Sequence, residues 1–455
     1  MQSKGYTFLI AIIGVSLLVK ILLLVITTTI PEKFLFVGDQ FEYFMRASAL
    51  VKGKGYHHYS TFRPPLYPLF LALIFYLFRS IFAAKLIQIL LSTFNVFILY
   101  LMSKRIFDEK VGLISALIFS LYPNLIFFSH TLWTETLFVF LLVSSIYFLI
   151  EFRYTQRNLL LLLSGLTWGL ASLTRSLLFY FLPIIFLWFM IFEKGRHKEK
   201  IIHFSLFAII TLITIAPWTY RNYLVYRSLL PISTTGGWIF RIGNNPKSVF
   251  VPKDDCKDWS FADGKKPFWF SREEVIEERH MYKRGLNFII NNNLLFLKKS
   301  LWEGRHFYTL DSFAIRHLRN GWYGKVPLSM IRALTTIIIV SYILVILMGT
   351  IGFIYSKNDD NKWLFIILIF IYTLIHSLAF SMSRYRLPLI PFVIIYSSYS
   401  FAHLHKIWKN ILTFPKIFIL IACFTFWIVI WTFDIPLLSD MLLTGGKNFQ
   451  FKNIP

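Results

Sequence analysis

Charged side chains are scarce in this sequence. Asp, Glu, Lys and Arg make up 15% of the 455 residues, whereas 56% are hydrophobic and 19% are aromatic. Since roughly a quarter of a soluble domain is charged, this composition excludes an ordinary soluble protein. The apolar residues gather in blocks of about 20, the length that a helix needs to cross a hydrocarbon core about 30 Å thick. The sequence therefore predicts an all-α, polytopic, integral membrane protein.

Acidic residues are few beside the basic ones. The chain has 47 Lys and Arg against 23 Asp and Glu, a formal net charge of +24. In a soluble protein this excess would suggest nucleic-acid binding. Here the basic residues gather in short loops between apolar blocks, as expected of anchors beside anionic lipid headgroups. We therefore expect membrane lipids as partners and no nucleic acid.

Cysteine is nearly absent. The two cysteines, Cys256 and Cys423, are too few for a disulfide framework or a thiolate metal site.

A cleaved signal peptide is not expected, because the first apolar run, from Phe8 to Ile30, is too long and lacks a small-residue cleavage site. We interpret this run as an uncleaved first helix.

The apolar blocks predict about 11 transmembrane helices. After the first helix, spans are expected near residues 82–103, 111–129, 133–151, 158–174, 176–192, 201–220, 328–355, 362–380, 385–405 and 413–433. The run Leu66–Phe78 has only about 13 residues, too few for the bilayer, and is predicted to be an interfacial juxtamembrane helix.

These spans divide the chain into three parts. Residues 1–220 form a predicted N-terminal transmembrane catalytic module that includes a first outer loop at 31–64. Residues 221–325 are too polar for the membrane and are expected to fold as an outer loop domain. Residues 326–455 supply the C-terminal transmembrane helices.

The distribution of Lys and Arg predicts the orientation. Cytoplasmic loops of membrane proteins are short and rich in these residues. Loops of this kind fall on one side of the predicted topology, near residues 104–110, 153–157, 194–200, 357–362 and 406–409. The N-terminus joins them, so it is predicted to be cytoplasmic, with the active site outside. This fits a prokaryotic cytoplasmic membrane, although in a eukaryote the same topology would face the lumen of the endoplasmic reticulum.

Acidic side chains stand at the outer ends of two predicted helices. Asp39 and Glu42 are three residues apart and share a helical face; Asp39 could cap the helix or, with its pKa raised by desolvation, act as a general base. Glu135 stands at the start of a span, where an ionisable group is costly and therefore a functional candidate, unless it only reaches toward the interface. A divalent ion could be held by Asp39 and Glu42 with His57 or His58, but the His pair fits no definite ligand spacing.

Arginines gather on the same outer side. Arg384 and Arg386 flank Tyr385 at the mouth of a span, and two guanidiniums there suit the oxygens of a phosphate. Arg63 and Arg175 are further candidates. Each of these arginines could instead anchor the chain at lipid headgroups.

In their order along the chain, these residues resemble the motifs of the GT-C superfamily of membrane glycosyltransferases, in the branch of the protein O-mannosyltransferases and aminoarabinose (lipid A) transferases. The motifs are GDxxxY at Gly38, Asp39 and Tyr43, RPPLYP at 63–68, TE at 134–135, PWTYRN at 217–222, GNNP at 243–246 and RYRLPLIP at 384–391. They cover most of the chain. The sequence departs from the protein O-mannosyltransferases by lacking a large extra outer domain after the long loop, which leaves the acceptor open.

The resemblance implies transfer of a sugar from a polyprenyl-phosphate donor to an acceptor on the outer face of the membrane. The acceptor could be a lipid, a glycan or a protein. Asp39 would be the general base and Glu135 the second acidic residue, and Arg384, Arg386, Arg63 and Arg175 would bind the donor phosphate. The substrate-lining residues would be Glu42, Tyr43, Tyr67, Arg221, Asn222, Gly243, Asn244, Asn245 and Tyr385. No cofactor is required, because arginines can neutralise the leaving phosphate, although a divalent metal stays open.

A transporter or flippase of polyprenyl-linked lipid or sugar is the alternative. Transporters place polar sites near the bilayer midplane and often show two related halves. Here the candidate residues lie at one face and the long loop breaks any symmetry, which favours the enzyme.

Overall fold

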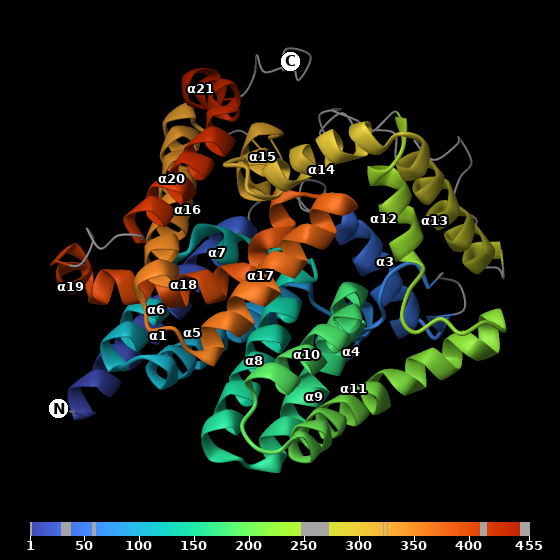
Figure 1. Ribbon diagram of the computed structural model, residues 1–455. Helices are drawn as coiled ribbons and strands as arrows, with labels where there is room; N and C mark the ends of the chain where they lie inside the picture. Colours follow the sequence, from blue (N-terminus) through green and yellow to red (C-terminus); the bar gives the residue numbers. More distant parts are fainter. Residues whose placement is uncertain are drawn as a thin grey trace.

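The computed structural model describes residues 2–28, 38–56, 61–246, 273–321, 323–324, 326–409 and 416–445. Within these ranges the regular structure is helical and contains no strand, which confirms the predicted all-α class. Figure 1 shows long helices packed side by side, with shorter helices across one end of the bundle.

Six of the described helices are long and apolar enough to cross a membrane. They are α1 (Gln2–Thr28), α5 (Ile81–Ile106), α8 (Glu135–Thr155), α11 (His197–Tyr226), α16 (Leu328–Tyr355) and α17 (Asp360–Leu378). Two bent pairs raise the count to as many as eight: α6 (Glu109–Leu121) with α7 (Pro123–Ser129), and α20 (Lys416–Thr432) with α21 (Ile435–Thr444). The chain is thus a multi-pass membrane protein, whereas the total of about 11 spans stays a prediction.

Shorter helices lie where the sequence predicted the other membrane segments. One of them, α4 (Leu66–Phe78), has the bounds of the predicted juxtamembrane helix. The others are α9 (Asn158–Thr174), η2 (Ser176–Phe181), α10 (Leu182–Phe192), η6 (Ser383–Leu389) and α18 (Ile390–Ala402). A further short helix, α19 (Leu404–Lys409), covers the predicted loop at 406–409. Because these helices are short, a count by length gives fewer spans than the apolar pattern does.

The bend of 56° between α6 and α7 has a local cause. Pro123 begins α7, where its missing N–H is tolerated, but it cannot continue α6. Tyr122, before the proline, takes an extended backbone with φ −68° and ψ 115°. The chain therefore turns at Tyr122, and α7 leads it toward Glu135 at the start of α8.

Side-chain caps begin several membrane helices. The hydroxyl of Ser80 accepts a hydrogen bond from the backbone of Ala83 at the start of α5. The carboxylates of Asp108 and Asp359 likewise accept hydrogen bonds from backbone N–H groups at the starts of α6 and α17. Each cap satisfies one of the backbone N–H groups that a first helical turn leaves unpaired.

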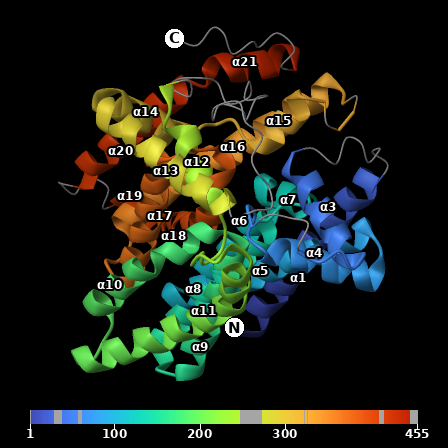
Figure 2. The same cartoon turned by 90° about the vertical axis from the view of Figure 1, so that its right-hand side faces the viewer.

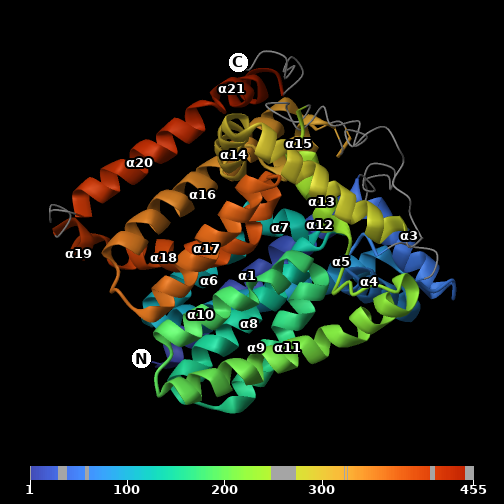
Figure 3. The same cartoon turned by 45° about the vertical axis from the view of Figure 1, so that its right-hand side comes forward.

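The central helix of the bundle is α8. In its most apolar stretch 78% of the residues are buried inside the protein, compared with 22% in α1 and in α11. It packs against α5 and α9, and α11 lies along α9 (Figures 2 and 3). Glu135, the first residue of α8, is therefore held inside the protein rather than at its lipid-facing edge.

Among the described residues of the predicted outer domain are four helices, which we call the loop helices. They are α12 (Thr235–Gly243), α13 (Glu273–Asn291), α14 (Asn293–Phe307) and α15 (Phe313–Arg319). Figure 1 shows them together across one end of the bundle. The Lys299 ammonium of α14 donates to the carbonyl oxygens of Leu378 and Ala379 at 2.9 and 2.8 Å. Because a cation stabilises the negative end of a helix, this contact fixes the loop helices to the end of α17.

Candidate active site

A cavity of about 400 Å³ lies between the loop helices and the adjoining ends of the membrane helices. Its volume is that of a small-molecule site, which is typically about 300 to 1,000 Å³. Its walls include most of the charged residues that the sequence singled out: Asp39, Arg63, Glu135, Arg175 and Arg384. Two of the predicted substrate-lining residues, Tyr43 and Tyr385, also line it.

The carboxylate of Asp39 lies between two arginines. Gly38 precedes it with φ 63°, a left-handed conformation that favours glycine, and α3 (Asp39–Val51) then begins at Asp39 itself. The side chain does not cap the helix, so that alternative is not observed. Instead, Oδ1 accepts from Nη2 of Arg63 at 2.7 Å, and Oδ2 accepts from Nη2 of Arg384 at 2.8 Å.

The pKa of Asp39 is lowered, not raised as the sequence led us to expect. Burial raises the pKa, but the charges of Arg63 and Arg384 and the hydrogen bonds that they donate outweigh burial. The expectation was wrong because it rested on desolvation alone. A carboxylate held in this way is ionised but is a weak base.

A second carboxylate, Glu42, holds Arg63 in place. Its Oε1 accepts from Arg46 at 2.7 Å, and its Oε2 accepts from Nε of Arg63 at 2.9 Å. The guanidinium of Arg63 also lies 5.6 Å from the centre of the Tyr43 ring, and Tyr43 packs edge-on against the fully buried Tyr67. Thus Glu42 and Tyr43 orient Arg63, and Tyr67 supports them from behind the cavity wall. Figure 2 shows α3 packed along α4, which carries Tyr67.

Glu135 forms a second ion pair on the same cavity. Its Oε1 accepts from Nη2 of Arg175 at 2.5 Å, and Nε of Arg175 donates to the hydroxyl of Thr134 at 3.3 Å. The Nε of Arg384 lies 4.0 Å from the same Glu135 oxygen and donates no hydrogen bond within the described chain. Arg384 therefore lies between the two carboxylates.

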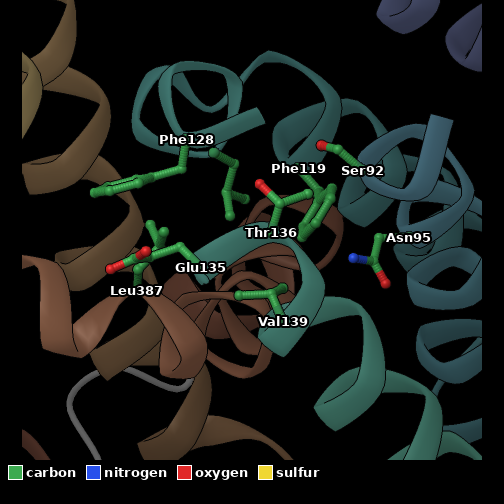
Figure 4. A pocket seen from close by; sticks show the side chains of 9 residues that line it. Ser92, Asn95, Phe119, Phe128, Glu135, Thr136, Val139 and Leu387 are labelled. Carbon is green, nitrogen blue, oxygen red and sulfur yellow. The ribbon is translucent and has the colours of Figure 1, made fainter. Parts of the chain in front are cut away.

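Figure 4 shows a second, smaller hollow, which Glu135 also borders. This hollow has a volume of about 10 Å³ and is also lined by Ser92, Asn95 and Thr136. It is too small for a sugar or a lipid headgroup, since about 10 to 15 Å³ is needed for a single water molecule. Of these two spaces, only the larger cavity has room for a substrate beside Glu135.

The structure separates the two arginines of the RYRLP motif. Arg384 faces the cavity, whereas Arg386 turns into the core and does not line it. Nη1 of Arg386 donates to the carbonyl oxygens of Phe307 and Thr309 at 2.9 and 2.6 Å, and its guanidinium lies 4.0 Å from the centre of the Tyr342 ring. These contacts give Arg386 a role in holding the segment after α14, while its assignment to the donor phosphate stays a prediction.

Arg221 and Asn222 also lie away from the cavity. The amide of Asn222 donates to the carbonyl oxygens of Leu230 and Ile232, and Nη1 of Arg221 donates to the hydroxyl of Thr61 at 2.9 Å. These contacts join the end of α11 to the segment that follows it and to the residues before α4. Neither side chain lines the cavity.

Gly243, Asn244 and Asn245 lie at the end of α12, and none of them lines the cavity. A Cβ atom at Gly243 would lie 1.7 Å from the carbonyl oxygen of Ala379, so only glycine permits this close contact with the end of α17. The amide of Asn244 donates to the carbonyl oxygen of Leu378 at 3.1 Å. Asn245 bonds back to the last turn of α12. The GNNP motif therefore docks a loop helix onto a membrane helix.

Sequence reasoning missed several aromatic residues of the cavity wall: Tyr180, Phe240, Tyr282, Tyr372 and His376. They come from η2, α12, α13 and α17, and nothing in their local sequence distinguishes them from other aromatic side chains of the chain. His376 stacks on Tyr385 with ring centres 4.6 Å apart, which places both on one side of the cavity.

The charged cluster does not form a metal site among the residues described. No group of three or more His, Cys, Asp or Glu side chains in that part of the chain could hold a metal ion. Asp39 and Glu42 already share the guanidinium of Arg63, and further arginines surround them. His57 and His58, the other ligands considered for a divalent ion, lie outside the described residues.

The sequence of part of this chain is similar to that of a known family. Residues 62–220, about a third of the chain, match the model of the dolichyl-phosphate-mannose-protein mannosyltransferase family. No curated protein sequence matches the chain. The matched segment runs from the residues before α4 to α11 and includes Arg63, Glu135 and Arg175.

The fold is similar to that of the oligosaccharyltransferase from Archaeoglobus fulgidus. Its apo crystal structure has a TM-score of 0.53 and 11% identity, over 95% of this chain and 56% of that one. Its complex with an inhibitory peptide and a dolichol-phosphate has a TM-score of 0.52 and 12% identity, over 91% and 54%. This chain thus spans about half the length of that protein.

A lower similarity links the chain to ArnT from Cupriavidus metallidurans, solved with undecaprenyl phosphate. The identity is 14% over 88% of this chain and 78% of that one, and the TM-score of 0.42 is too low to support an argument about the fold. The membrane helices, the similarity to the archaeal enzyme and the matched segment confirm what the motifs predicted: this chain has the GT-C fold.

Proposed function

We propose that this protein transfers a sugar from a polyprenyl-phosphate donor to an acceptor, with Asp39 as the general base. The observation that carries the proposal is the carboxylate of Asp39 held between Arg63 and Arg384, at 2.7 and 2.8 Å, in a cavity of about 400 Å³. The matched mannosyltransferase family and the dolichol-phosphate in the archaeal complex support a donor linked to a polyprenyl phosphate.

Binding of the donor would change the partners of the two arginines. Phosphate and carboxylate oxygens compete for the same guanidinium donors, and arginine binds phosphate in two-point geometry. As the donor phosphate enters, Arg63 and Arg384 turn from Asp39 to the phosphate. Since these arginines are what lowers the pKa of Asp39, their departure makes the carboxylate a stronger base at the moment when a base is needed.

The transfer itself is a single displacement. The acceptor oxygen attacks the anomeric carbon of the sugar while its proton passes to a carboxylate oxygen of Asp39. The bond between the anomeric carbon and the phosphate oxygen breaks, and its electron pair stays with the phosphate. Arg63 and Arg384, now bound to the phosphate, neutralise this charge, so the scheme does not require a metal.

Glu135 and Arg175 would act as positioning residues. Their ion pair places a negative charge 4.0 Å from Nε of Arg384, which keeps the guanidinium extended between the two carboxylates. Arg175 also adds positive charge to the cavity wall, where an anionic donor is attracted. This scheme does not need Arg386, whose Nη1 donates to two backbone carbonyl oxygens of the core; its assignment to the donor phosphate stays a prediction.

The reaction would take place on the outer face of a membrane, most simply a prokaryotic cytoplasmic membrane with the N-terminus inside. The support is the distribution of Lys and Arg in the short loops, on the side opposite the cavity residues. Residues 221–325 would then form an outer loop domain that closes the cavity, between a catalytic module at 1–220 and the C-terminal helices at 326–455.

The test is a transfer assay in liposomes with a panel of radiolabelled polyprenyl-phosphate sugars. The native protein should consume at least one donor, and Asp39→Asn should consume it at a rate lower by roughly 10² to 10⁴, the range that a general base contributes. Asp108→Asn is the matched control. It makes the same chemical change at the cap of α6, where asparagine caps as well as aspartate, and should stay active.

The same liposomes test the rival function. If no donor is consumed but labelled lipid crosses the bilayer, the protein is a flippase and the proposal is overturned. Native activity in Asp39→Asn would instead keep the transferase and remove Asp39 as its base.

A further inference from the structure

The charged residues occupy only part of the cavity wall, and the rest has a different chemistry. The wall formed by η2, α12 and α13 carries the rings of Tyr180, Phe240 and Tyr282. Tyr180 and Tyr282 are 59% and 38% exposed, and the rings of Phe240 and Tyr282 lie 5.6 Å apart. Tyrosine offers an apolar ring face together with a hydroxyl that can donate or accept a hydrogen bond. This wall therefore suits a ligand that has both C–H faces and hydroxyls.

A carboxyl group, Glu278, lies beside these rings. Glu278 and Tyr282 are four residues apart on α13, so they share one face of that helix. The Oε1 of Glu278 accepts a long hydrogen bond of 3.5 Å from the backbone N–H of Gly237. Within the described chain it forms no ion pair, and Arg279, the next residue in the sequence, donates to Ser228. The carboxyl thus keeps acceptor capacity for a ligand.

The charge environment of this group agrees with that geometry. The pKa of Glu278 is raised to about 7, chiefly by burial and also by the charge of Glu274. The hydrogen bond from Gly237 and the charge of Arg279 lower the pKa but do not outweigh burial. The pKa of the Tyr282 hydroxyl is also raised, first by burial, then by the charge of Glu278 and by Tyr180. Within the described ranges no ion pair is formed with Glu278, in contrast to the paired arginines elsewhere on the cavity wall.

Glu278 does not itself line the cavity, but Gly236 does, and Gly236 lies next to both groups. A Cβ atom at Gly236 would lie 2.2 Å from the Tyr282 hydroxyl and 3.6 Å from Oε1 of Glu278, so the carboxyl lies directly behind the glycine at this wall. Helix packing explains two other glycines, since Gly237 contacts the backbone of α13 and Gly285 contacts the Phe240 ring. At Gly236, by contrast, a hydroxyl and a carboxyl oxygen meet where the wall carries no side chain.

The ligand that fits this wall is a neutral sugar ring. A phosphate would be repelled by Glu278, and an isoprenoid chain would remove water from a carboxyl and a hydroxyl without replacing their hydrogen bonds. A sugar stacks its C–H face on an aromatic ring and donates its hydroxyls to a carboxyl. We propose that Tyr180, Tyr282 and Glu278 form a binding subsite for a neutral sugar ring, belonging to the acceptor or to the donor. This proposal rests on the proposed function but concerns binding rather than transfer.

The test measures binding without any reaction. Three neutral probes, the methyl glycosides of mannose, glucose and galactose, are offered to the full-length protein in nanodiscs, and saturation-transfer difference NMR detects contact. At least one glycoside should bind, and Glu278→Gln and Tyr282→Leu should each weaken its binding about tenfold, the effect of losing one good hydrogen bond or ring contact. Glu277→Gln, next on the same helix, and the exposed Tyr223→Leu on α11 are matched controls that should bind as the native protein does.

The outcomes separate this proposal from the proposed function. Absence of glycoside binding, or binding that both cavity variants leave unchanged, overturns the subsite even if transfer is observed. Glycoside binding that depends on these residues supports the subsite even if no donor is ever consumed. Displacement of the glycoside by an intact polyprenyl-phosphate sugar, but not by polyprenyl phosphate alone, assigns the subsite to the donor sugar; binding beside the intact donor assigns it to the acceptor.

Discussion

Nη2 of Arg384 donates to Oδ2 of Asp39 at 2.8 Å, although 345 positions separate the two residues in the sequence. Asp39 begins α3, whereas Arg384 lies in η6, which follows α16 and α17 in the chain. The contact joins the two terminal parts of the chain on the wall of one cavity. It also determines the chemistry of the carboxylate, because arginine partners lower its pKa more than burial raises it.

The two arginines of the RYRLP motif should differ in function. Arg384→Gln removes a guanidinium from the cavity and should weaken binding of polyprenyl phosphate by roughly tenfold to a hundredfold, as expected for a charged hydrogen bond. Arg386→Gln removes two hydrogen bonds from the core and should instead lower the melting temperature. Isothermal titration and thermal denaturation on the same detergent samples measure both effects. Equal losses of binding in the two variants would contradict the separation of roles.

The buried pair of Glu135 and Arg175 should show strong coupling. Glu135→Gln leaves a guanidinium without its carboxylate and should destabilise the protein by about 3 kcal/mol. Glu135→Gln combined with Arg175→Gln should recover part of this loss, because neither charge then stays unpaired. Glu151→Gln breaks the more exposed pair with Arg105 and should cost only about 0 to 1 kcal/mol. Thermal denaturation of Glu135→Gln, Arg175→Gln, their combination and Glu151→Gln gives the four values. A double variant that loses as much stability as the two single variants together, or more, would refute the coupling.

Replacement of Glu278 by glutamine should stabilise the protein in a pH-dependent manner. The folded-state pKa of about 7 lies above the value of roughly 4.3 expected in the unfolded chain, so folding favours the protonated carboxyl. Ionisation of Glu278 therefore has no effect on stability below the unfolded pKa and its full unfavourable effect above pH 7. Glu278→Gln stays neutral, so its melting temperature should exceed the native value at pH 8 and approach it near pH 4. The neighbouring charged and titratable groups, Glu274, Arg279, Tyr180 and Tyr282, are unchanged in this comparison. A constant difference across this pH range would contradict the raised pKa.

Much of the fold was predictable because a membrane-spanning helix must be apolar over about 20 residues, a pattern that is visible in the sequence. Apolar blocks identified the membrane helices, and the short run Leu66–Phe78 became a helix with those same bounds. The charged candidates were also predictable in part, since an ionisable residue at the start of a span is rare without a function. Five of them do line one cavity. Their roles in catalysis stay predictions, as does the total number of spans.

Other features of the site depend on geometry that no local pattern records. Arg384 and Arg386 lie in a 3₁₀ helix with three residues per turn, so side chains two positions apart point in different directions. The pKa of Asp39 could not be predicted without knowing which arginines reach it. The wall of Tyr180, Tyr282 and Glu278 arises only when α13 docks on α12, and these residues have no motif of their own. The asparagines and the glycine of GNNP looked like substrate-lining residues, yet they dock α12 onto α17.

The measurement that tests the account most directly is the affinity of sugar-free polyprenyl phosphate for the native protein and for Asp39→Asn. If Arg63 and Arg384 exchange a carboxylate for a phosphate, removing the carboxylate removes both a competitor for their donors and a repelling charge. We predict that Asp39→Asn binds polyprenyl phosphate about tenfold more tightly than the native protein. Equal or weaker binding by Asp39→Asn would contradict the exchange, because the arginines would then not be the groups for which carboxylate and phosphate compete.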